Sequence, residues 1–246
     1  MKRHLWIACA ASAVLLASAQ ATAAQAGGDK RASKDKKTAA DRGLMEDKGR
    51  FRLLVDGQQV GTEEFHIAPD GTGWSARGKA ELKAGAASAQ VSAQLRLAAE
   101  GAPVTYECVT QSNRKDTVTV AFNGSVARMD LQTEGSQPFT QEMTFDTGPV
   151  IILDNNMYHH YAILARLYDW QAKGEQSFAV LIPQDQVPGS ITVKAGGPQE
   201  VDGTRYEVLR VQTSDLVVDL FLDPSRRLMR LTVADSKVEV VRDKSS

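Results

Sequence analysis

Apolar and polar residues alternate with a period of two along most of the chain after about Phe51. Turn dipeptides such as Asp56-Gly57 and Asn123-Gly124 recur roughly every 8–12 residues, which is typical of antiparallel strands joined by hairpins. Strands of this pattern have one buried and one solvated face. The clearest alternation places Ala89, Val91, Ala93, Leu95 and Leu97 on one side and Gln90, Ser92, Gln94 and Arg96 on the other.

The stretch 216–222 differs because both of its sides are largely apolar. Such a strand is central in its sheet or is covered by another element. Together with the preceding strands and the hairpin through Asp202-Gly203, the pattern predicts ten or more strands, which a flat open sheet does not accommodate. We therefore expect a mainly β protein with a strongly curved antiparallel sheet or a partial barrel.

One segment, between Asn155 and Trp170, lacks this period and contains neither Gly nor Pro. Asp154 or Asn155 can cap its start and Gly174 follows its end, which predicts an amphipathic helix of about fifteen residues. We expect the helix to pack on the sheet or to plug its open side. The apolar face contains Met157, His160, Tyr161, Leu164 and Tyr168, which are the candidate ligand-binding residues.

The polar residues of this segment suggest no metal motif, since adjacent histidines on a helix point about 100° apart. His160 lies in the apolar face, so we expect a buried histidine that is hydrogen-bonded to the backbone or to a tyrosine. His159 falls with Arg166 and is expected to be exposed, and Asp154 is expected to be a cap. Elsewhere, Glu63 and Glu64 face opposite sides of a strand and cannot act as a carboxylate pair.

The N-terminus has the features of a secretory signal peptide. Lys2 and Arg3 precede an apolar run from Leu5 to Ala17, and a small-residue exit ends at Ala26. The run is too short for a stable membrane span. We therefore expect a signal peptide over 1–26, a flexible charged linker over 27–43 and a single β domain over 44–246, in a periplasmic or secreted protein.

Composition limits the chemistry further. The chain has 29 basic and 30 acidic residues, with no clustered basic and aromatic footprint, so no nucleic-acid partner is expected. Cleavage removes Cys9 and leaves only Cys108, so no intramolecular disulfide can form. Cys108 is expected to be a buried residue on the same side of its strand as Val104 and Tyr106. We find no catalytic motif, and we expect no metal and no cofactor.

Three short segments carry a family resemblance. The hairpin 51–65, the run Tyr158-His159-His160-Tyr161 and the run Ile182-Pro183-Gln184 resemble a group of uncharacterised exported bacterial β-rich proteins. The resemblance implies an architecture similar to the half-barrel of the LolA/LolB lipoprotein carriers. It implies no catalytic residues.

Three functions remain open at this point. The first is a non-enzymatic binding protein of the bacterial cell envelope whose partner is an apolar small molecule or a lipid. The second is a structural or assembly factor that contacts an envelope protein, and the third is a hydrolase that uses Asp154, His159 or His160 on an unrecognised plan. An unfilled apolar cavity of roughly 300 Å³ or more would favour the first function over the second.

Overall fold

The computed structural model describes residues 43–145 and 149–244. The expected signal peptide over 1–26, and all of the expected linker except Gly43, lie outside these ranges. The first half of the described chain consists of strands β1 (Asp47–Val55), β2 (Gln58–Asp70), β3 (Gly73–Ala84), β4 (Ala87–Leu97), β5 (Pro103–Gln111), β6 (Lys115–Asn123), β7 (Val126–Thr133) and β8 (Phe139–Thr144).

The second half contains the single α-helix of the described residues. Its elements are β9 (Val150–Ile152), α1 (His159–Leu167), β10 (Gln176–Ile182), the 3₁₀ helix η2 (Pro183–Asp185), β11 (Val187–Val201), β12 (Thr204–Gln212), β13 (Val217–Leu222), β14 (Leu228–Val233), the 3₁₀ helix η3 (Ala234–Ser236) and β15 (Val238–Arg242).

All fifteen strands of the described residues form one sheet, in the order β8-β7-β6-β5-β4-β3-β2-β1-β15-β14-β13-β12-β11-β10-β9. The described strands start at the middle of the sheet with β1, continue outward to the edge strand β8, resume at the other edge with β9 and return to the middle with β15. Strands β1 and β15 pair antiparallel at the centre, with Leu53 opposite Val240. Of the strands in the described residues, only the short β9 runs parallel to its neighbour, β10.

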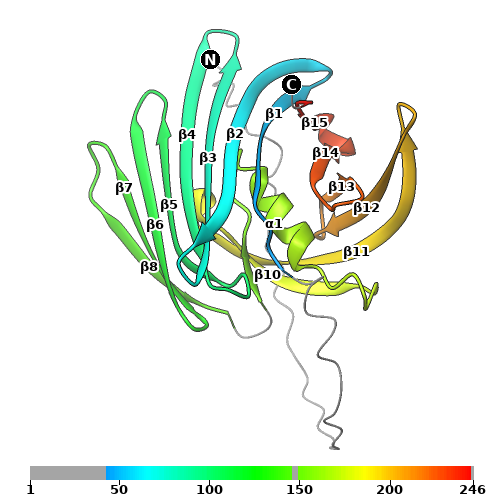
Figure 1. Cartoon of the computed structure of the whole chain (residues 1–246). Coiled ribbons are helices and arrows are strands. Elements are labelled where there is room, and N and C mark those ends of the chain that lie inside the picture. Colours follow the sequence, from blue (N-terminus) through cyan, green and yellow to red (C-terminus); the bar gives the residue numbers. More distant parts are fainter. Residues whose placement is uncertain (1–42, 146–148, 245–246) are drawn as a thin grey trace, which may run out of the picture.

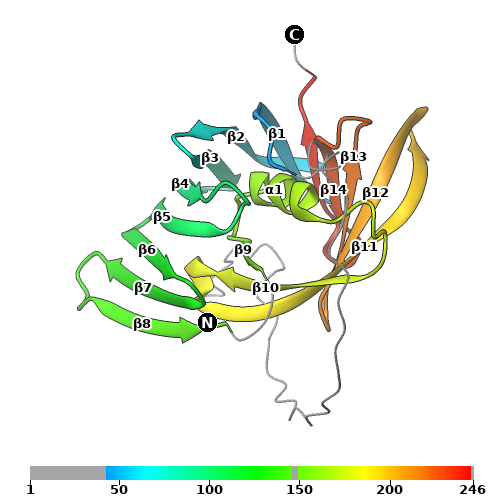
Figure 2. The same cartoon turned by 60° about the horizontal axis from the view of Figure 1, so that its bottom comes forward.

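The sheet curls around helix α1 without closing into a barrel (Figures 1 and 2). The helix lies in the hollow of the sheet. Its end approaches the β4–β5 turn, where a Cβ on Gly101 would lie 2.4 Å from the Leu167 side chain. On the other half of the sheet, the helix packs near β14, and Arg166 donates a hydrogen bond to the carbonyl of Ser225. The expectation of a curved antiparallel sheet with one helix inside it is thus confirmed.

The predicted alternation is present in the strands. In β4, Val91, Ala93, Leu95 and Leu97 are buried while Ser92 and Arg96 are exposed. The hairpin turns also follow the sequence: Asp56 and Gly57 have φ of 50° and 75°, the positive values that a tight two-residue hairpin turn needs. The stretch predicted to be central forms β13, which lies between β12 and β14.

Helix α1 is shorter than the sequence predicts. It spans nine residues, His159–Leu167, and not the whole of 155–170. Asn156 has a φ of 63°, outside the helical region, and Tyr168 is extended with a ψ of 131°. The absence of Gly and Pro therefore did not mark the helix ends, because Asn adopts the left-handed conformation at low cost.

Val104 is also placed differently from its prediction. Leu97 pairs with Pro103 and Arg96 pairs with Thr105, so Val104 is the extra residue of a β-bulge and is 43% exposed. A bulge shifts the alternation by one residue. Tyr106 and Cys108 beyond it are buried as predicted. Among the described residues, none of the helices has the length and hydropathy that a bilayer span requires.

Candidate functional site

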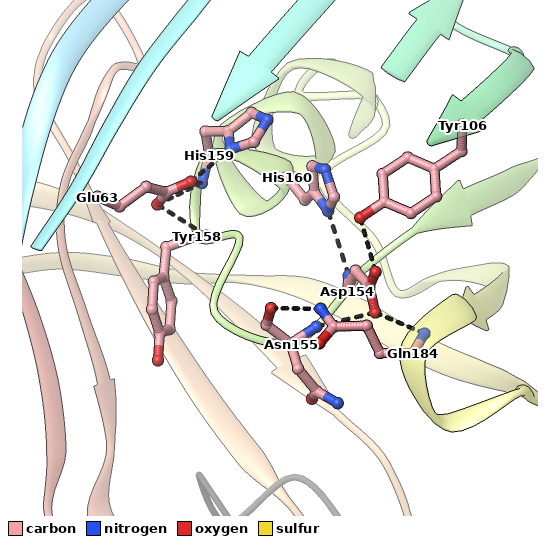
Figure 3. A network of polar contacts seen from close by, with 8 residues as sticks. All are labelled: Glu63, Tyr106, Asp154, Asn155, Tyr158, His159, His160 and Gln184. Atoms are coloured by element: carbon pink, nitrogen blue, oxygen red, sulfur yellow. Dashed lines mark hydrogen bonds and ion pairs between the residues drawn. The ribbon is translucent and has the colours of Figure 1, made fainter. Parts of the chain in front are cut away.

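A buried network of polar side chains lies between the start of α1 and the inner face of the sheet (Figure 3). It brings together residues of four distant segments: β2, β5, the connection from β9 into α1, and the 3₁₀ helix η2. The network consists of two linked groups, one around Glu63 and one around Asp154. Beside the second group is an apolar pocket, and the two features together form the candidate site.

Glu63 holds the first turn of the helix from β2. Its carboxylate accepts hydrogen bonds from the backbone N–H of Tyr158, at 2.9 Å, and of His159, at 3.3 Å. These N–H groups have no partner within the helix, and a carboxylate at a helix N-terminus also interacts favourably with the helix dipole. The Glu63 side chain is fully buried. The cap of this helix is therefore a residue almost a hundred positions earlier in the chain.

His159 completes this group. Its Nδ1 lies 2.5 Å from Oε1 of Glu63, and its side chain has no exposure to solvent. Its ring stacks near Phe65, with centroids 6.0 Å apart, under the backbone of Gly78. The prediction that His159 is exposed is wrong. The sheet encloses this helix on more sides than a flat sheet would cover an amphipathic helix. The side of the helix that His159 shares with Arg166 therefore does not face water at His159.

Asp154 organises the second group. Oδ1 accepts hydrogen bonds from the backbone N–H of Asn155 and of Gln184, each at 3.0 Å, and Oδ2 accepts one from the hydroxyl of Tyr106, at 2.6 Å. Burial raises the pKa of this carboxyl from 3.8 to about 6, although the hydrogen bonds counteract part of the shift. The prediction of a helix cap is wrong, because Tyr158 occupies the cap position without a side-chain hydrogen bond.

These hydrogen bonds join the two halves of the sheet across its interior. Tyr106 and Thr110 belong to β5, whereas Gln184 belongs to η2 and Asp154 follows β9. Thr110 donates a hydrogen bond to the side-chain carbonyl of Gln184, at 3.3 Å, and the amide of Gln184 donates to the carbonyl of Asn155, at 2.9 Å. The segment that crosses between the sheet edges is thereby fixed to the inner face of β5.

His160 lies between the two groups. Its Nδ1 accepts a hydrogen bond from the backbone N–H of Asp154, at 3.2 Å, and its ring meets the Tyr106 ring edge-on, with centroids 5.7 Å apart. Burial lowers the pKa of His160 well below 6.5, and His159 lowers it further. The ring is therefore neutral at neutral pH. The prediction of a core histidine with a backbone hydrogen bond is confirmed.

Cys108 and Tyr106 are unsuited to nucleophilic chemistry. Burial raises the pKa of the Cys108 thiol to about 12, and Asp154 adds to the shift. Burial and the neighbouring Asp154 likewise raise the pKa of the Tyr106 hydroxyl well above 10. A reactive cysteine needs a lowered pKa and access to solvent. Cys108 thus has the properties of a packing residue.

The pocket lies between the start of the helix and the inner face of β10–β13, with a volume of about 140 Å³. Its apolar wall includes Leu153, Val180, Ile191, Val211 and Val218. Its polar lining comprises Asp154, Asn155, Asn156, Thr213, Ser214 and Asp215, and two tyrosines, Tyr158 and Tyr161, also contribute. The Tyr158 ring points away from the Glu63 group (Figure 3).

The candidate ligand-binding residues occupy two kinds of position. Tyr161 lines the pocket. The other four, Met157, His160, Leu164 and Tyr168, are buried in the core. Tyr168, for example, donates a hydrogen bond to the carbonyl of Gly174, at 2.8 Å, and accepts one from the backbone N–H of Ala195, at 3.2 Å.

A second, charged groove lies where the two ends of the described chain meet. Its volume is about 450 Å³, and its lining includes Asp47, Arg227 and Arg242. Arg242 forms a buried two-point ion pair with Asp47, at 2.6 and 3.1 Å. Among the described residues, no group of three or more His, Cys, Asp or Glu side chains is placed to bind a metal ion.

Several of these residues were missed by sequence reasoning. Glu63 was considered only as a neighbour of Glu64, although it shares the inward side of β2 with Phe65 and Ile67. A carboxylate on the apolar side of a strand is itself a signal, because buried charged groups need partners. The β12–β13 turn around Thr213 carries no such signal.

By sequence, no protein-family model and no curated protein matches this chain. By structure, the chain is similar to a β-barrel-like protein of Brucella abortus that is described as a domain of unknown function, DUF1849. The TM-score is 0.53 at 9% identity, and the match covers 82% of this chain and 96% of that one. At this identity the likeness concerns the fold alone.

A second similar structure is a DUF1089 family protein of Pseudomonas aeruginosa. It matches with a TM-score of 0.44 and 11% identity, over 68% of this chain and 87% of that one. The β-rich, barrel-like character predicted from the sequence therefore has a counterpart in a solved structure, the DUF1849 protein.

Proposed function

We propose that this protein is a non-enzymatic binding protein that takes an apolar group into the pocket between α1 and strands β10–β13. The observation that carries the proposal is the pocket itself, an apolar wall with a few polar groups beside it, which is the usual make-up of a small-molecule site. The barrel-like fold shared with the DUF1849 protein is compatible with such a role.

The pocket volume limits the size of the occupant. It is about 140 Å³, below the roughly 300 Å³ of ordinary ligand sites, so the size criterion that would favour a binding function over an assembly role is not met. An engineered apolar cavity of about 150 Å³ in another protein accommodates benzene. The pocket therefore suits one aromatic ring or a short alkyl group, and a two-chain lipid would place most of its apolar surface outside. If the ligand is a lipid, as the resemblance to the LolA/LolB carriers implies, we propose that only a single apolar end of it enters the pocket.

The place of action is part of the proposal. The N-terminal segment, with Lys2 and Arg3 before an apolar run, supports export to the periplasm or beyond. Detection of the tagged protein in a periplasmic extract, with loss of export on deletion of residues 1–26, tests it.

The hydrolase alternative has less support. The side chains of His159 and His160 are buried at 0% exposure, and neither lines the pocket. Asp154 reaches the pocket, but its carboxylate already accepts three hydrogen bonds that hold the crossing segment in place. A general base or nucleophile must contact its substrate.

A direct test is an NMR titration of the full chain with benzyl alcohol, a ring-sized neutral probe. We expect shifts in the methyl signals of the pocket and a dissociation constant of about 1 mM or tighter, which corresponds to roughly 4 kcal/mol. Val187→Phe, which fills the pocket from β11, should abolish binding. Val217→Phe is the matched control, because Val217 is exposed and lies outside the pocket. Equal binding by both variants would contradict the proposal.

The assembly role remains a second candidate because of the edge strand β8. Within the described part of the chain this strand pairs only with β7, and it carries Phe139, which is 46% exposed. Free strand edges pair readily with other chains. If β8 binds an envelope partner, co-elution with that partner should be lost in Phe139→Asp and retained in Val104→Asp, which changes an exposed residue of β5.

A further inference from the structure

The charged groups around the pocket are of one sign. Asp154, in the connection from β9 into α1, and Asp215, in the β12–β13 turn, both line it. No Lys, Arg or His is among the described residues that line the pocket. A carboxylate, phosphate or sulfate head group would therefore face two acidic side chains without a basic partner, at a cost in free energy.

The aromatic lining of the pocket also favours a positively charged ligand. Tyr158 and Tyr161 both line the pocket, and the face of a phenol ring attracts cations through its quadrupole. The recognition of alkylated ammonium groups combines such rings with nearby negative charge. The two tyrosines thus add to the effect of the carboxylates and do not oppose it.

The remaining polar groups of the pocket can accommodate a hydrogen-bond donor. Asn155, Asn156, Thr213 and Ser214 also line the pocket, and each carries an oxygen that can accept a hydrogen bond from an ammonium group, although their N–H and O–H groups can donate as well. Asp154 already accepts hydrogen bonds from two backbone N–H groups and from Tyr106. An ammonium head group would therefore be attracted by the negative charge of Asp154, without needing a free acceptor position on its carboxylate.

We propose that the ligand of this pocket is a small amphiphilic cation, with a ring-sized apolar body against Ile191 and Val218 and an ammonium head near Asp154 and Asp215. This inference rests on the proposed binding function and specifies its ligand class. An anionic amphiphile, such as a fatty acid, is the excluded class. Free amines and ammonium groups attached to a larger molecule share this head-group chemistry.

Three probes of one size separate the inference from the function on which it rests. Benzylamine, benzyl alcohol and benzoate carry the same ring with a cationic, neutral or anionic head near neutral pH. The full chain is titrated with each probe and binding is followed by NMR. The affinity should decrease in the order benzylamine, benzyl alcohol, benzoate. A hydrogen bond to a charged group adds about 1.5 kcal/mol or more, so we expect at least about tenfold between the cation and the anion.

Two variants assign the preference. Asp215→Asn should reduce the ratio between cation and anion severalfold, and this exposed position of the β12–β13 turn leaves the core unchanged. Asp154→Asn should reduce it further. Asp235→Asn, in the exposed 3₁₀ helix η3, is the matched control and should keep the ratio of the wild type.

Each outcome has one meaning. Binding of all three probes with equal affinity overturns the inference and leaves the proposed function in place, as does a preference for benzoate. A cation preference that survives both Asp215→Asn and Asp154→Asn also overturns it. Binding of none of the probes overturns the proposed function and the inference together. If benzylamine is preferred, vesicles whose lipid carries a phenethylamine head group are added. Binding to these vesicles distinguishes a membrane-borne head group from a free amine.

Discussion

Glu63 on β2 and His159 at the start of α1 lie 2.5 Å apart, with both side chains fully buried. Glu63 also accepts the backbone N–H groups of the first helical turn. One carboxylate thus fixes both the ring and the backbone of the helix start against the sheet. The position of the pocket beside this turn depends on that contact.

Glu63→Leu should lower the free energy of unfolding by about 3 kcal/mol or more, because it leaves buried donors without partners. Glu63→Gln keeps the size and one acceptor oxygen and should recover most of the loss. Urea denaturation measures both. Glu64→Gln changes the exposed neighbour and should be within about 0.5 kcal/mol of the wild type. Equal effects at Glu63 and Glu64 would contradict the structure.

Gly78→Ala should destabilise the protein by about 2 kcal/mol or more through a steric clash. An added Cβ would lie 2.5 Å from Cε1 of His159 and 3.0 Å from Oε1 of Glu63, and neither group is free to move. Gly196→Ala is the control, since its nearest neighbour would be 3.4 Å away. Thermal unfolding compares the two. A tolerated Gly78→Ala would show that the helix start is not held at this distance.

The stability of the protein should depend on the protonation of Asp154. The folded pKa of about 6 is above the ordinary 3.8, so the contribution of this group is fully present below pH 3.8 and is lost as pH rises through about 6. A shift of about two pKa units corresponds to about 3 kcal/mol. Asp154→Asn cannot titrate, and its unfolding free energy relative to the wild type should rise across this range.

The comparison with Asp154→Asn is needed because His160 acts in the opposite direction. Its lowered pKa makes the wild type lose stability as pH falls below 6.5, and the variant shares this effect. The difference between the two proteins then reports on Asp154 alone. A difference that is constant from pH 3.8 to 7 would contradict the raised pKa of Asp154.

His160→Ala should lower the free energy of unfolding by about 2–4 kcal/mol, because it removes the acceptor of the Asp154 N–H and leaves a cavity. His160→Asn places an oxygen near the former Nδ1 and should recover part of this loss. Differential scanning calorimetry provides the measurement. Unchanged stability in His160→Ala would instead support a role for His160 outside the core and would revive the hydrolase alternative.

The regular parts of the fold were predictable because they depend on local pattern. The hairpin at Asp56-Gly57 and the alternation along β4 follow from turn chemistry and side-chain period. The burial of His159 was not predictable from the helical pattern, since it depends on how far the sheet curls around α1. The Val104 bulge was missed for a similar reason: one inserted residue leaves no mark in composition.

The candidate site was predicted less well than the fold. Asp154, His159 and His160 were recognised in the sequence as the residues that a hydrolase would use, and Tyr161 was named from its helix face. The partners Glu63, Tyr106 and Gln184 come from segments far away in sequence, and only the sheet order brings them together. Helix phase alone also does not separate pocket-lining residues from core residues such as Leu164.

The antiparallel joint between β1 and β15 has a consequence for how the molecule assembles. Apart from the parallel pair β9–β10, each half of the sheet is a succession of hairpins between neighbours in the chain, whereas the joint pairs residues almost two hundred positions apart. Closing so large a loop is entropically costly, and such contacts slow folding. The hairpins of the two halves of the sheet would therefore form early, and the pairing of β1 with β15 would be the last and slowest step of folding.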